Sequence, residues 1–166
     1  MQVWRLARSV YPALDGEGAR RYGGRWNAPG TPVVYTAASL SLAALELLVH
    51  LNPDQLPNDL MAYAIDIPDG LAVQRIGVED LPTGWDRHAE DARLRRLGQA
   101  WADPEESSVE DGPDKGVPDK GVPVLNVPSA VIPEERNVLI NPRHPDASEV
   151  TVSHERPFTF DPRLLE

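Results

Sequence analysis

A helix predicted at residues 40–51, with the sequence LSLAALELLVHL, constrains the fold of this chain more than any other segment. Its residues are apolar around nearly the whole helix circumference, so the helix should be buried. Ser39 can cap its N-terminus, and Asn52-Pro53 should end it. A chain of 166 residues is long enough to bury such a helix in one domain with a real core.

One carboxylate, Glu46, interrupts this helix on the stripe of Leu42, Leu45 and Val49. A carboxylate there is costly unless it is hydrogen-bonded or paired. Two interpretations stay open. In the structural one, Glu46 pairs with an arginine or reaches solvent; in the functional one, it faces a cleft, where a perturbed acid is useful. His50 follows one turn later, but two potential ligands without a third do not predict a metal site.

The segment GGRWNAPG at residues 23–30 places an arginine and a tryptophan side by side among turn residues. Glycines allow a ligand to approach the backbone closely, and the guanidinium of Arg25 matches diphosphate oxygens. The alternatives are a solvated Arg25 and a Trp26 that anchors the loop in the core. Tyr35 follows on a short predicted strand, where a tyrosine is more often a core residue than a catalytic one.

Ser129 lies between two prolines in VPSAVIP. No G-x-S-x-G elbow accompanies it, so it is not interpreted as the nucleophile of a hydrolase. A hydrogen bond to a nearby backbone group is one hypothesis for its hydroxyl, and a contact to a ligand is the other.

The remaining pattern predicts a single mixed α+β domain, with strands at both ends and helices between them. Strands are predicted at 3–8, 33–37, 60–68 and 71–76, a core pattern resumes at 124–133 and 137–142, and 149–160 alternates again. Leu94, Leu97 and Trp101 have helical spacing, which predicts an amphipathic helix over 86–101. Residues 11–32, rich in Gly, Pro and Asn, are expected to form a loop. No GxGxxG or Walker loop occurs.

An acidic, Gly- and Pro-rich segment at 102–123 contains DKGVP twice in tandem, at 114–118 and 119–123. A repeat this short does not predict a solenoid. We interpret it as a surface loop lengthened by duplication inside one domain that spans 1–166, and we expect mobility there rather than chemistry.

The net charge of −10 is unevenly distributed, because residues 1–30 carry five arginines against Asp15 and Glu17. An acidic protein is a poor general binder of nucleic acid, so direct DNA binding is not expected. A local arginine cluster suits a small anionic ligand such as a nucleotide diphosphate, although a solvated basic edge is the alternative.

The chain has no cysteine, no run of about 20 apolar residues and no signal-peptide pattern at its start, which favours the cytosol and excludes a membrane span. The four histidines lie far apart and predict no metal site.

Several of these segments together resemble the RES domain, the toxins of bacterial type II toxin–antitoxin pairs. The matching segments are WRLAR (4–8), GARRYGGRWN (18–27), PVVYTAASLSLAALELLVH (32–50) and LNVPSAVIPEERNVLINPRHPD (125–146). The arginine, glutamate and serine that give the family its name match Arg25, Glu46 and Ser129, and Tyr35 matches the tyrosine that usually accompanies them. The resemblance covers nearly the whole chain, and the DKGVP duplication is its one departure.

The resemblance implies an ADP-ribosyltransferase-like fold, with a split, mixed β-sheet and surrounding helices around an NAD cleft. Members degrade NAD by hydrolysis or phosphorolysis, and some ADP-ribosylate a protein. NAD is then a substrate, and no cofactor is implied. The implied partner is an Xre-type helix-turn-helix antitoxin that blocks the cleft, and a toxin homodimer is expected within the complex. A non-enzymatic nucleotide-binding module is the hypothesis from a different class.

Within that resemblance, cleavage of the nicotinamide–ribose bond creates an oxocarbenium-like centre, and a carboxylate near the ribose hydroxyls stabilises its charge. Glu46 is the candidate for that role. Arg25 would hold a phosphate or ribose oxygen, with Arg5 as a second candidate for the diphosphate. Tyr35 would stack on or position the nicotinamide, and Ser129 would hydrogen-bond within the nicotinamide-ribose end. Trp26 is expected to bind NAD as an aromatic wall of the pocket. These roles require Arg25 and Glu46 to line one cavity.

Overall fold

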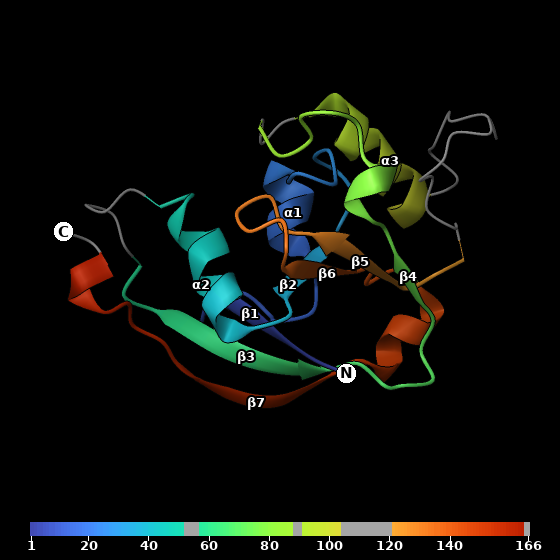
Figure 1. The fold of residues 1–166 in the computed structure, drawn as a ribbon. Coiled ribbons are helices and arrows are strands. Elements are labelled where there is room, and N and C mark those ends of the chain that lie inside the picture. Colours follow the sequence, from blue (N-terminus) through green and yellow to red (C-terminus); the bar gives the residue numbers. More distant parts are fainter. Residues whose placement is uncertain (52–56, 88–90, 104–120, 165–166) are drawn as a thin grey trace.

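One mixed β-sheet carries the fold, in a computed structural model that describes residues 1–51, 57–87, 91–103 and 121–164 (Figure 1). Within these residues the sheet has seven strands: β1 (Gln2–Arg8), β2 (Val34–Ala37), β3 (Leu60–Asp66), β4 (Val73–Arg75), β5 (Val124–Pro128), β6 (Arg136–Ile140) and β7 (Thr151–Pro157). The α-helices described are α1 (Glu17–Tyr22), α2 (Leu40–Leu48) and α3 (Ala92–Ala102). Short 3₁₀ turns cover Val78–Asp80, Pro145–Glu149 and Pro162–Leu164.

The sheet is divided into two halves that meet at a narrow junction. Its strand order is β4-β5-β6-β2-β1-β3-β7; β4 and β5 are parallel, and the other neighbours are antiparallel. Strands β1 and β3 are in register along the whole of β1, whereas β1 and β2 share the single pair Trp4–Ala37. This arrangement is a split, mixed sheet with helices packed on it, and it confirms the predicted α+β fold.

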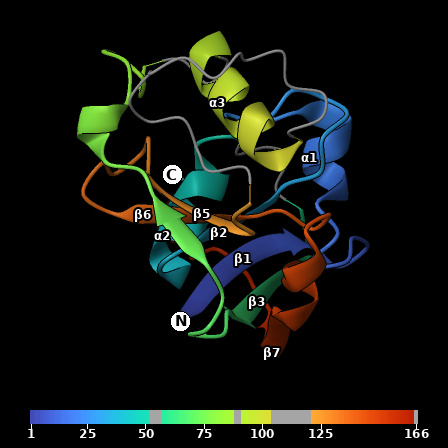
Figure 2. The ribbon, with the colours of Figure 1, turned by 90° about the vertical axis from the view of Figure 1, so that its right-hand side faces the viewer.

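The two faces of the sheet bury different apolar clusters, because successive side chains on a strand point to opposite sides. The first core cluster includes Val3, Val34, Tyr63, Ile65, Val138 and Ile140. The second core cluster, on the other face, includes Trp26, Val33, Leu94, Trp101, Leu125 and Leu139. Figures 1 and 2 show α1 and α3 over the β2-β6-β5 half and α2 over the β1-β3 half.

Helix α2 begins as predicted and ends earlier. The Ser39 hydroxyl accepts a hydrogen bond from the backbone N–H of Leu42 at 3.1 Å, so the predicted N-cap is confirmed. The helix ends at Leu48, and the predicted stop at 52–53 lies outside the described residues. The expectation that the whole helix is buried is wrong, because Leu42 and Ala43 are its buried residues and Val49 at its end is 59% exposed. One side of α2 packs on the sheet and the other borders a cavity, described below.

Two further boundaries differ from the sequence prediction. The segment 11–32 contains α1, which follows Gly16 in the left-handed region at φ 65°. The amphipathic helix predicted over 86–101 is α3, which begins only after Asp91, whose carboxylate accepts from the backbone N–H of Arg93 at 2.8 Å. Residues 86 and 87 lie in a turn and a bend, and 88–90 are outside the described residues. An N-cap placed late in a helix-forming sequence sets the start of the helix, because it satisfies backbone donors that otherwise lack a partner.

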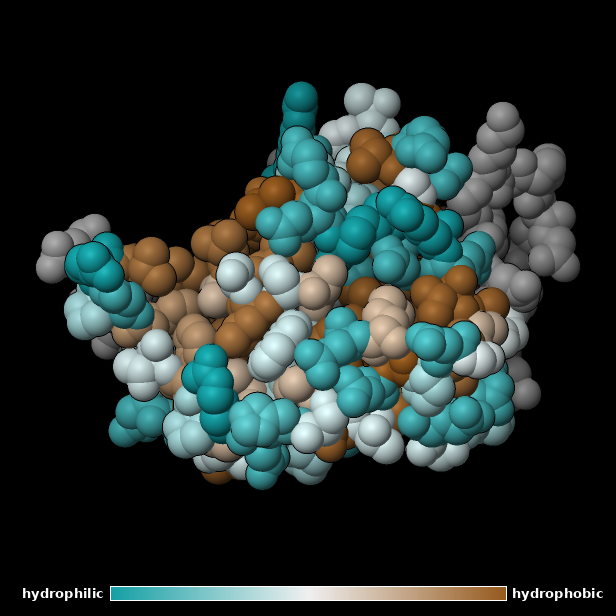
Figure 3. All heavy atoms as spheres, turned by 60° about the horizontal axis from the view of Figure 1, so that its bottom comes forward, coloured by the Kyte–Doolittle hydropathy of each residue, from teal (hydrophilic) through white to brown (hydrophobic). Residues whose placement is uncertain are grey.

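The strand predicted within 149–160 is present as β7, but its environment differs from what alternation indicates. A period of two is typical of a half-buried strand, yet all seven residues of β7 are exposed. The apolar residues that flank it, Val150 and Phe160, are each 5% exposed. Strand β7 is the edge of the sheet and pairs with β3 alone. Figure 3 shows hydrophilic residues along the lower edge of this view and apolar residues gathered at its upper left.

The acidic segment predicted at 102–123 lies mostly outside the described residues, since 104–120 are among those not described. Ala102 belongs to α3, so the helix extends into the first position of that segment. At its other end, the Trp101 indole Nε1 donates to the Val122 carbonyl at 2.7 Å. In the part of the chain that the structure describes, no helix combines the length and the apolar character needed to cross a membrane.

Candidate functional site

A cavity of about 570 Å³ opens on the face of the sheet that carries α1 and α2. Its walls come from β1, β2 and β6, from α2, from the loop at 23–26 and from the turn after β5. Arg5, Arg25, Trp26, Tyr35 and Glu46 all border it. The volume lies within the ~300–1,000 Å³ that small-molecule sites occupy. The structure therefore brings Arg25 and Glu46 to one cavity, as the sequence hypothesis requires.

Glu46 is held by two neutral donors that reach the same carboxylate oxygen. The Ser129 hydroxyl donates to Oε1 at 2.7 Å, and the Asn137 amide Nδ2 donates to Oε1 at 2.5 Å. The open question about this carboxylate is thus answered in part: Glu46 is hydrogen-bonded, and it also borders a cavity. Because both donors are uncharged, they orient the carboxylate without neutralising it.

Arg25 is fixed from outside the cavity by the segment that precedes α3. Its Nη1 donates to the Trp85 carbonyl at 2.9 Å. Burial lowers the pKa of Arg25, and the negative charges of Glu46 and then Asp86 oppose that shift. The acid and the guanidinium thus carry opposite charges at the border of the same cavity.

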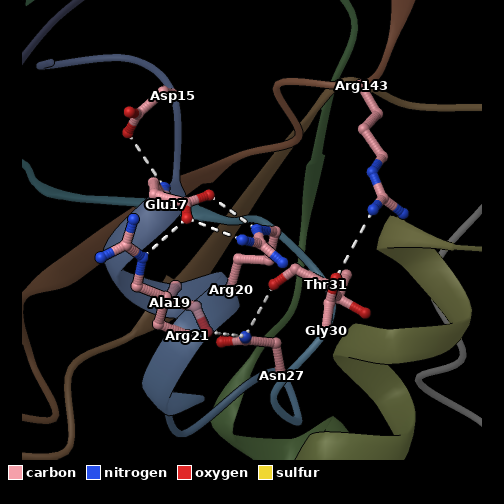
Figure 4. A network of polar contacts seen from close by, with 9 residues as sticks. All are labelled: Asp15, Glu17, Ala19, Arg20, Arg21, Asn27, Gly30, Thr31 and Arg143. Carbon is pink, nitrogen blue, oxygen red and sulfur yellow. Dashed lines mark hydrogen bonds and ion pairs between the residues drawn. The ribbon is translucent and has the colours of Figure 1, made fainter.

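The loop that carries Arg25 is built around the buried side chain of Asn27. Its Nδ2 donates to the carbonyls of Ala19 at 2.9 Å, Ala28 at 3.1 Å and Thr31 at 2.9 Å. Figure 4 shows the Asn27 amide directed at Ala19 and Thr31, which ties the loop to α1. The Tyr35 hydroxyl completes the arrangement, since it donates to Asn27 Oδ1 at 2.7 Å.

Tyr35 and Trp26 both border the cavity, and both also have structural roles. The Tyr35 hydroxyl accepts from the Trp26 backbone N–H at 3.0 Å, and burial raises the pKa of Tyr35. Gly24 packs on this hydroxyl so closely that a Cβ would lie 2.6 Å from it. Trp26 is 2% exposed and belongs to the second core cluster, as the core-anchor hypothesis predicts. Contacts from either ring to a ligand stay predictions.

Ser129 is fully buried at the end of β5, behind Glu46. Its Oγ accepts from the backbone N–H groups of Val131 and Ile132, each at 3.0 Å, so the hypothesis of a backbone contact is confirmed. The cavity is bordered by Ala130 and Val131 in this segment. The structure thus places the Ser129 hydroxyl against Glu46, and a direct bond from it to the ribose stays a prediction.

Arg5 borders the cavity, but its side chain has other neighbours. Trp4 and Leu6 pack with α2, and the alternation along β1 places Arg5 on the opposite face of the sheet. Burial lowers the pKa of Arg5, and the charges of Asp15 and then Tyr63 oppose that shift. Tyr63 belongs to the first core cluster, which lies on that opposite face. This placement favours a structural role for Arg5 over a diphosphate contact.

The other arginines of the basic N-terminal segment are paired at the surface. Arg8 pairs with Asp59 at 2.9 Å. Glu17 accepts from Arg20 at 2.6 Å and from Arg21 at 2.7 Å, and these bonds lower the pKa of Glu17 to about 2 (Figure 4). The charge cluster seen in the sequence is therefore mostly neutralised locally. Among the five arginines of that segment, Arg25 is the one whose electrostatic partners include Glu46.

Sequence reasoning missed Asn137 and the support that α3 gives to the loop. Arg95 donates to the Gly24 carbonyl at 3.1 Å, and Gln99 donates to the Thr31 hydroxyl at 2.5 Å. Gly98 packs against Trp26. An asparagine at the start of the apolar strand sequence NVLINP was the available indication of Asn137; no comparable indication existed for α3. In the described residues, no three His, Asp or Glu side chains gather where they could hold a metal ion.

Residues 2–161 match the RES domain family. The chain belongs to the RES domain family. The matched residues include the loop, α2, β5 and β6, which supply the site described above. Relatives match along nearly their full length. "Prs ADP-ribosylating toxin" of Sphingobium sp. (strain YBL2) is 37% identical over 98% of this chain and 95% of its own. "Toxin Res" of Photorhabdus laumondii is 35% identical over 100% and 98%.

A chain with the same fold as this RES protein occurs in a solved structure, that of the M.tuberculosis MbcT-MbcA toxin-antitoxin complex. The two superpose with a TM-score of 0.68, covering 99% of this chain and 86% of that one, at 20% sequence identity. The likeness at that identity concerns the fold, and it agrees with the ADP-ribosyltransferase-like split sheet seen here. By its family and its relatives, this chain is a RES-domain toxin.

Proposed function

We propose that this RES toxin binds NAD in the 570 Å³ cavity and breaks the bond between nicotinamide and ribose. The observation that carries the proposal is that an oriented, hydrogen-bonded carboxylate, Glu46, and a guanidinium, Arg25, border the same cavity. A dinucleotide presents complementary charges to these groups. Its diphosphate is anionic, and its nicotinamide ribose becomes cationic as the bond breaks.

For this reaction the protein needs mainly to position the substrate and to stabilise the charge that develops on it. Nicotinamide carries a positive charge in the substrate, so it leaves as a neutral molecule without a general acid. The electron deficiency remains on the ribose as an oxocarbenium-like centre, as in glycoside cleavage. Glu46 stabilises that charge from a fixed position, and Arg25 holds a phosphate or ribose oxygen. The Tyr35 ring at the cavity wall offers a surface on which the nicotinamide ring stacks.

The acceptor of the ADP-ribosyl group distinguishes three reactions. Water gives hydrolysis, phosphate gives phosphorolysis, and a protein side chain gives ADP-ribosylation. The name of the Sphingobium relative, an ADP-ribosylating toxin, favours transfer to a protein as the second candidate. All three share the step in which Glu46 and Arg25 act, so the proposal for these residues does not depend on the acceptor.

The proposal includes an antitoxin partner, because the matching structure is that of a toxin-antitoxin complex. We further propose, from the family resemblance, that this antitoxin is of the Xre helix-turn-helix type, that it blocks the cavity, and that toxins pair as homodimers in the complex. An antitoxin carboxylate that approaches Arg25 in place of a phosphate would account for inhibition. A complex in which the antitoxin lies far from Arg25 would contradict this part.

The experiment is incubation of purified, antitoxin-free protein with NAD, with and without phosphate and with and without cell extract, while nicotinamide and the ribosyl product are measured. Wild-type protein should release nicotinamide. Glu46→Gln, a neutral isostere, should lower the rate ~100–1,000-fold, as loss of one aligned electrostatic group does. Glu149→Gln, an exposed acid that does not line the cavity, is the matched control and should not change the rate.

Binding and growth separate the enzyme from a nucleotide-binding module. A module would bind NAD in wild-type and Glu46→Gln proteins alike and release no nicotinamide under any of these conditions. An enzyme should also arrest growth when expressed without a partner, and Arg25→Ala or Glu46→Ala should abolish the arrest. Absence of nicotinamide release from folded wild-type protein would reject the proposed reaction.

A further inference from the structure

We propose that Asn137 is a positioning residue for Glu46, and that it gives the two carboxylate oxygens different roles. In this assignment Oε1 is tied to the protein and Oε2 is the oxygen that meets the substrate. The inference rests on the proposed function, because it assigns a cause to the orientation of the carboxylate in that reaction. It concerns a residue outside the arginine, glutamate and serine for which the family is named.

The hydrogen bonds at Glu46 are unequally distributed between its two oxygens. Ser129 and Asn137 both donate to Oε1, at 2.7 Å and 2.5 Å. Among the described residues, these two bonds are the ones made to the carboxylate, and none reaches Oε2. A carboxylate oxygen has two lone pairs in its plane, so two donors occupy Oε1 fully. The oxygen left to accept a hydroxyl or to face a developing positive charge is Oε2.

The backbone of Asn137 is fixed on both sides, which makes its amide a rigid support. It lies on β6, in register with Ala37 of β2 and with Val127 of β5. Ser129 follows β5 on the same hairpin, and its backbone N–H donates to the Glu135 carbonyl at 3.0 Å. One donor therefore lies on β6 and the other directly follows the neighbouring strand β5, so the pairing of these strands sets their spacing. Groups carried on paired strands hold a site more tightly than groups on loops.

The other half of the Asn137 amide indicates why an asparagine occupies this position. Its Oδ1 is buried and has no hydrogen-bond partner in the described part of the chain. A buried acceptor without a partner destabilises the fold, whereas an apolar side chain of similar shape would not carry that penalty. Exchange of the two amide atoms would be worse, because Oδ1 would then face the Glu46 carboxylate. The bond from Nδ2 to Glu46 is the gain that offsets this penalty.

Asn137 is a cleaner probe of positioning than Ser129. The Ser129 hydroxyl also accepts from the backbone of Val131 and Ile132, so its removal disturbs the turn after β5. The Asn137 side chain has one hydrogen bond in the described residues, and that bond ends on Glu46. A change at Asn137 should therefore affect the carboxylate and little else.

The test compares Asn137→Leu with Asn141→Leu, an asparagine just beyond the same strand. Asn141 has both amide groups satisfied: Nδ2 donates to the Ala102 carbonyl at 3.0 Å, and Oδ1 accepts from the Arg143 N–H at 3.0 Å. With full-length protein and NAD, Asn137→Leu should lower kcat for nicotinamide release ~10–100-fold, the range for residues that orient a functional ligand. Its KM for NAD should change less than about threefold and its Tm should hold or rise, as expected when orientation rather than binding is lost.

Asn141→Leu should show the reverse, a lower Tm with wild-type kcat below the melting range. Asn137→Ser, which keeps a shorter hydroxyl donor, should fall between wild type and Asn137→Leu in kcat, and it preserves the test if leucine does not fit. Wild-type kcat in both Asn137 variants, or a loss of kcat that follows a loss of Tm, would overturn the inference while the proposed reaction stands. If wild-type protein releases no nicotinamide, the proposed function fails and this inference fails with it.

Discussion

Two glycines in helices of this protein should respond to the same substitution with opposite signs. Gly98 lies inside α3 and Gly18 inside α1. Replacing glycine by alanine within a helix ordinarily stabilises a protein by about 0.5–1 kcal/mol, because glycine loses more backbone entropy on folding. At Gly18 a Cβ would meet nothing within 4 Å, so the ordinary gain should appear.

At Gly98 a Cβ would lie 1.8 Å from the Trp26 carbonyl oxygen, 2.7 Å from its carbonyl carbon and 2.9 Å from its Cβ. These are backbone and near-backbone atoms, so no rotamer change relieves the contact, and α3 has to move from the loop. Overpacking of a tight contact costs about 1–3 kcal/mol, which exceeds the helix-propensity gain. Gly98→Ala should therefore destabilise the fold by about 1–2 kcal/mol net.

Thermal unfolding at neutral pH, followed by circular dichroism or calorimetry, measures both variants against wild type. For a domain of this size 1 kcal/mol corresponds to about 2–4 °C in Tm. Gly98→Ala should then lower Tm by about 2–8 °C, while Gly18→Ala should raise it by about 1–4 °C. Gly98→Ala should also weaken NAD binding, since the displaced Trp26 adjoins Arg25. A Tm for Gly98→Ala raised as much as that for Gly18→Ala would refute the close approach of α3 to the loop.

Two further changes probe the loop and the start of α3. Tyr35→Phe leaves Asn27 Oδ1 and the Trp26 N–H without their shared partner. It should lower the free energy of unfolding, measured in urea, by about 1–3 kcal/mol. An unchanged urea midpoint would contradict the role given to this hydroxyl. Asp91→Ala removes an N-cap and should cost about 1 kcal/mol at pH 7. The hydrogen bonds from Arg93 lower the pKa of Asp91 from 3.8 to about 2, so its contribution is present above the unfolded-state pKa and is lost as the pH falls toward 2. The Tm difference between wild type and Asp91→Ala should shrink over that range, and a constant difference would exclude the assigned cause.

The local elements were largely predictable, because they depend on neighbouring residues. Ser39 caps α2 as expected, and β6 ends at Ile140, just before Asn141-Pro142, where proline cannot continue a ladder. The N-terminus of α3 was placed too early, because charged, alanine-rich residues at 86–90 favour a helix until an N-cap at Asp91 competes for the same backbone donors. Glycine and proline between 11 and 32 hid α1, whose six residues are too few to give a periodic pattern.

Site residues were predictable where a side chain is chemically unusual for the segment that carries it. A carboxylate in an apolar helix and an arginine in a glycine-built loop are conspicuous in the sequence, and both border the cavity. The arginine cluster left two interpretations open, because a sequence does not show which charges meet: Glu17 pairs with Arg20 and Arg21, and Asp59 pairs with Arg8. Arg5 is placed by the pleat of β1 beside Asp15 and Tyr63.

By itself, the sequence determined most of the elements, the family and the residue types that the chemistry needs, because periodicity, capping and motif order are local properties of the chain. The tertiary structure decided which partner each of those residues has. Ser129 and Asn137 are 83 and 91 residues from Glu46 along the chain, and only the pairing of β5 with β6 brings both donors to one oxygen. Hydrogen bonds act over about 3 Å, so the orientation of the carboxylate is fixed by strand register, which a linear sequence does not display.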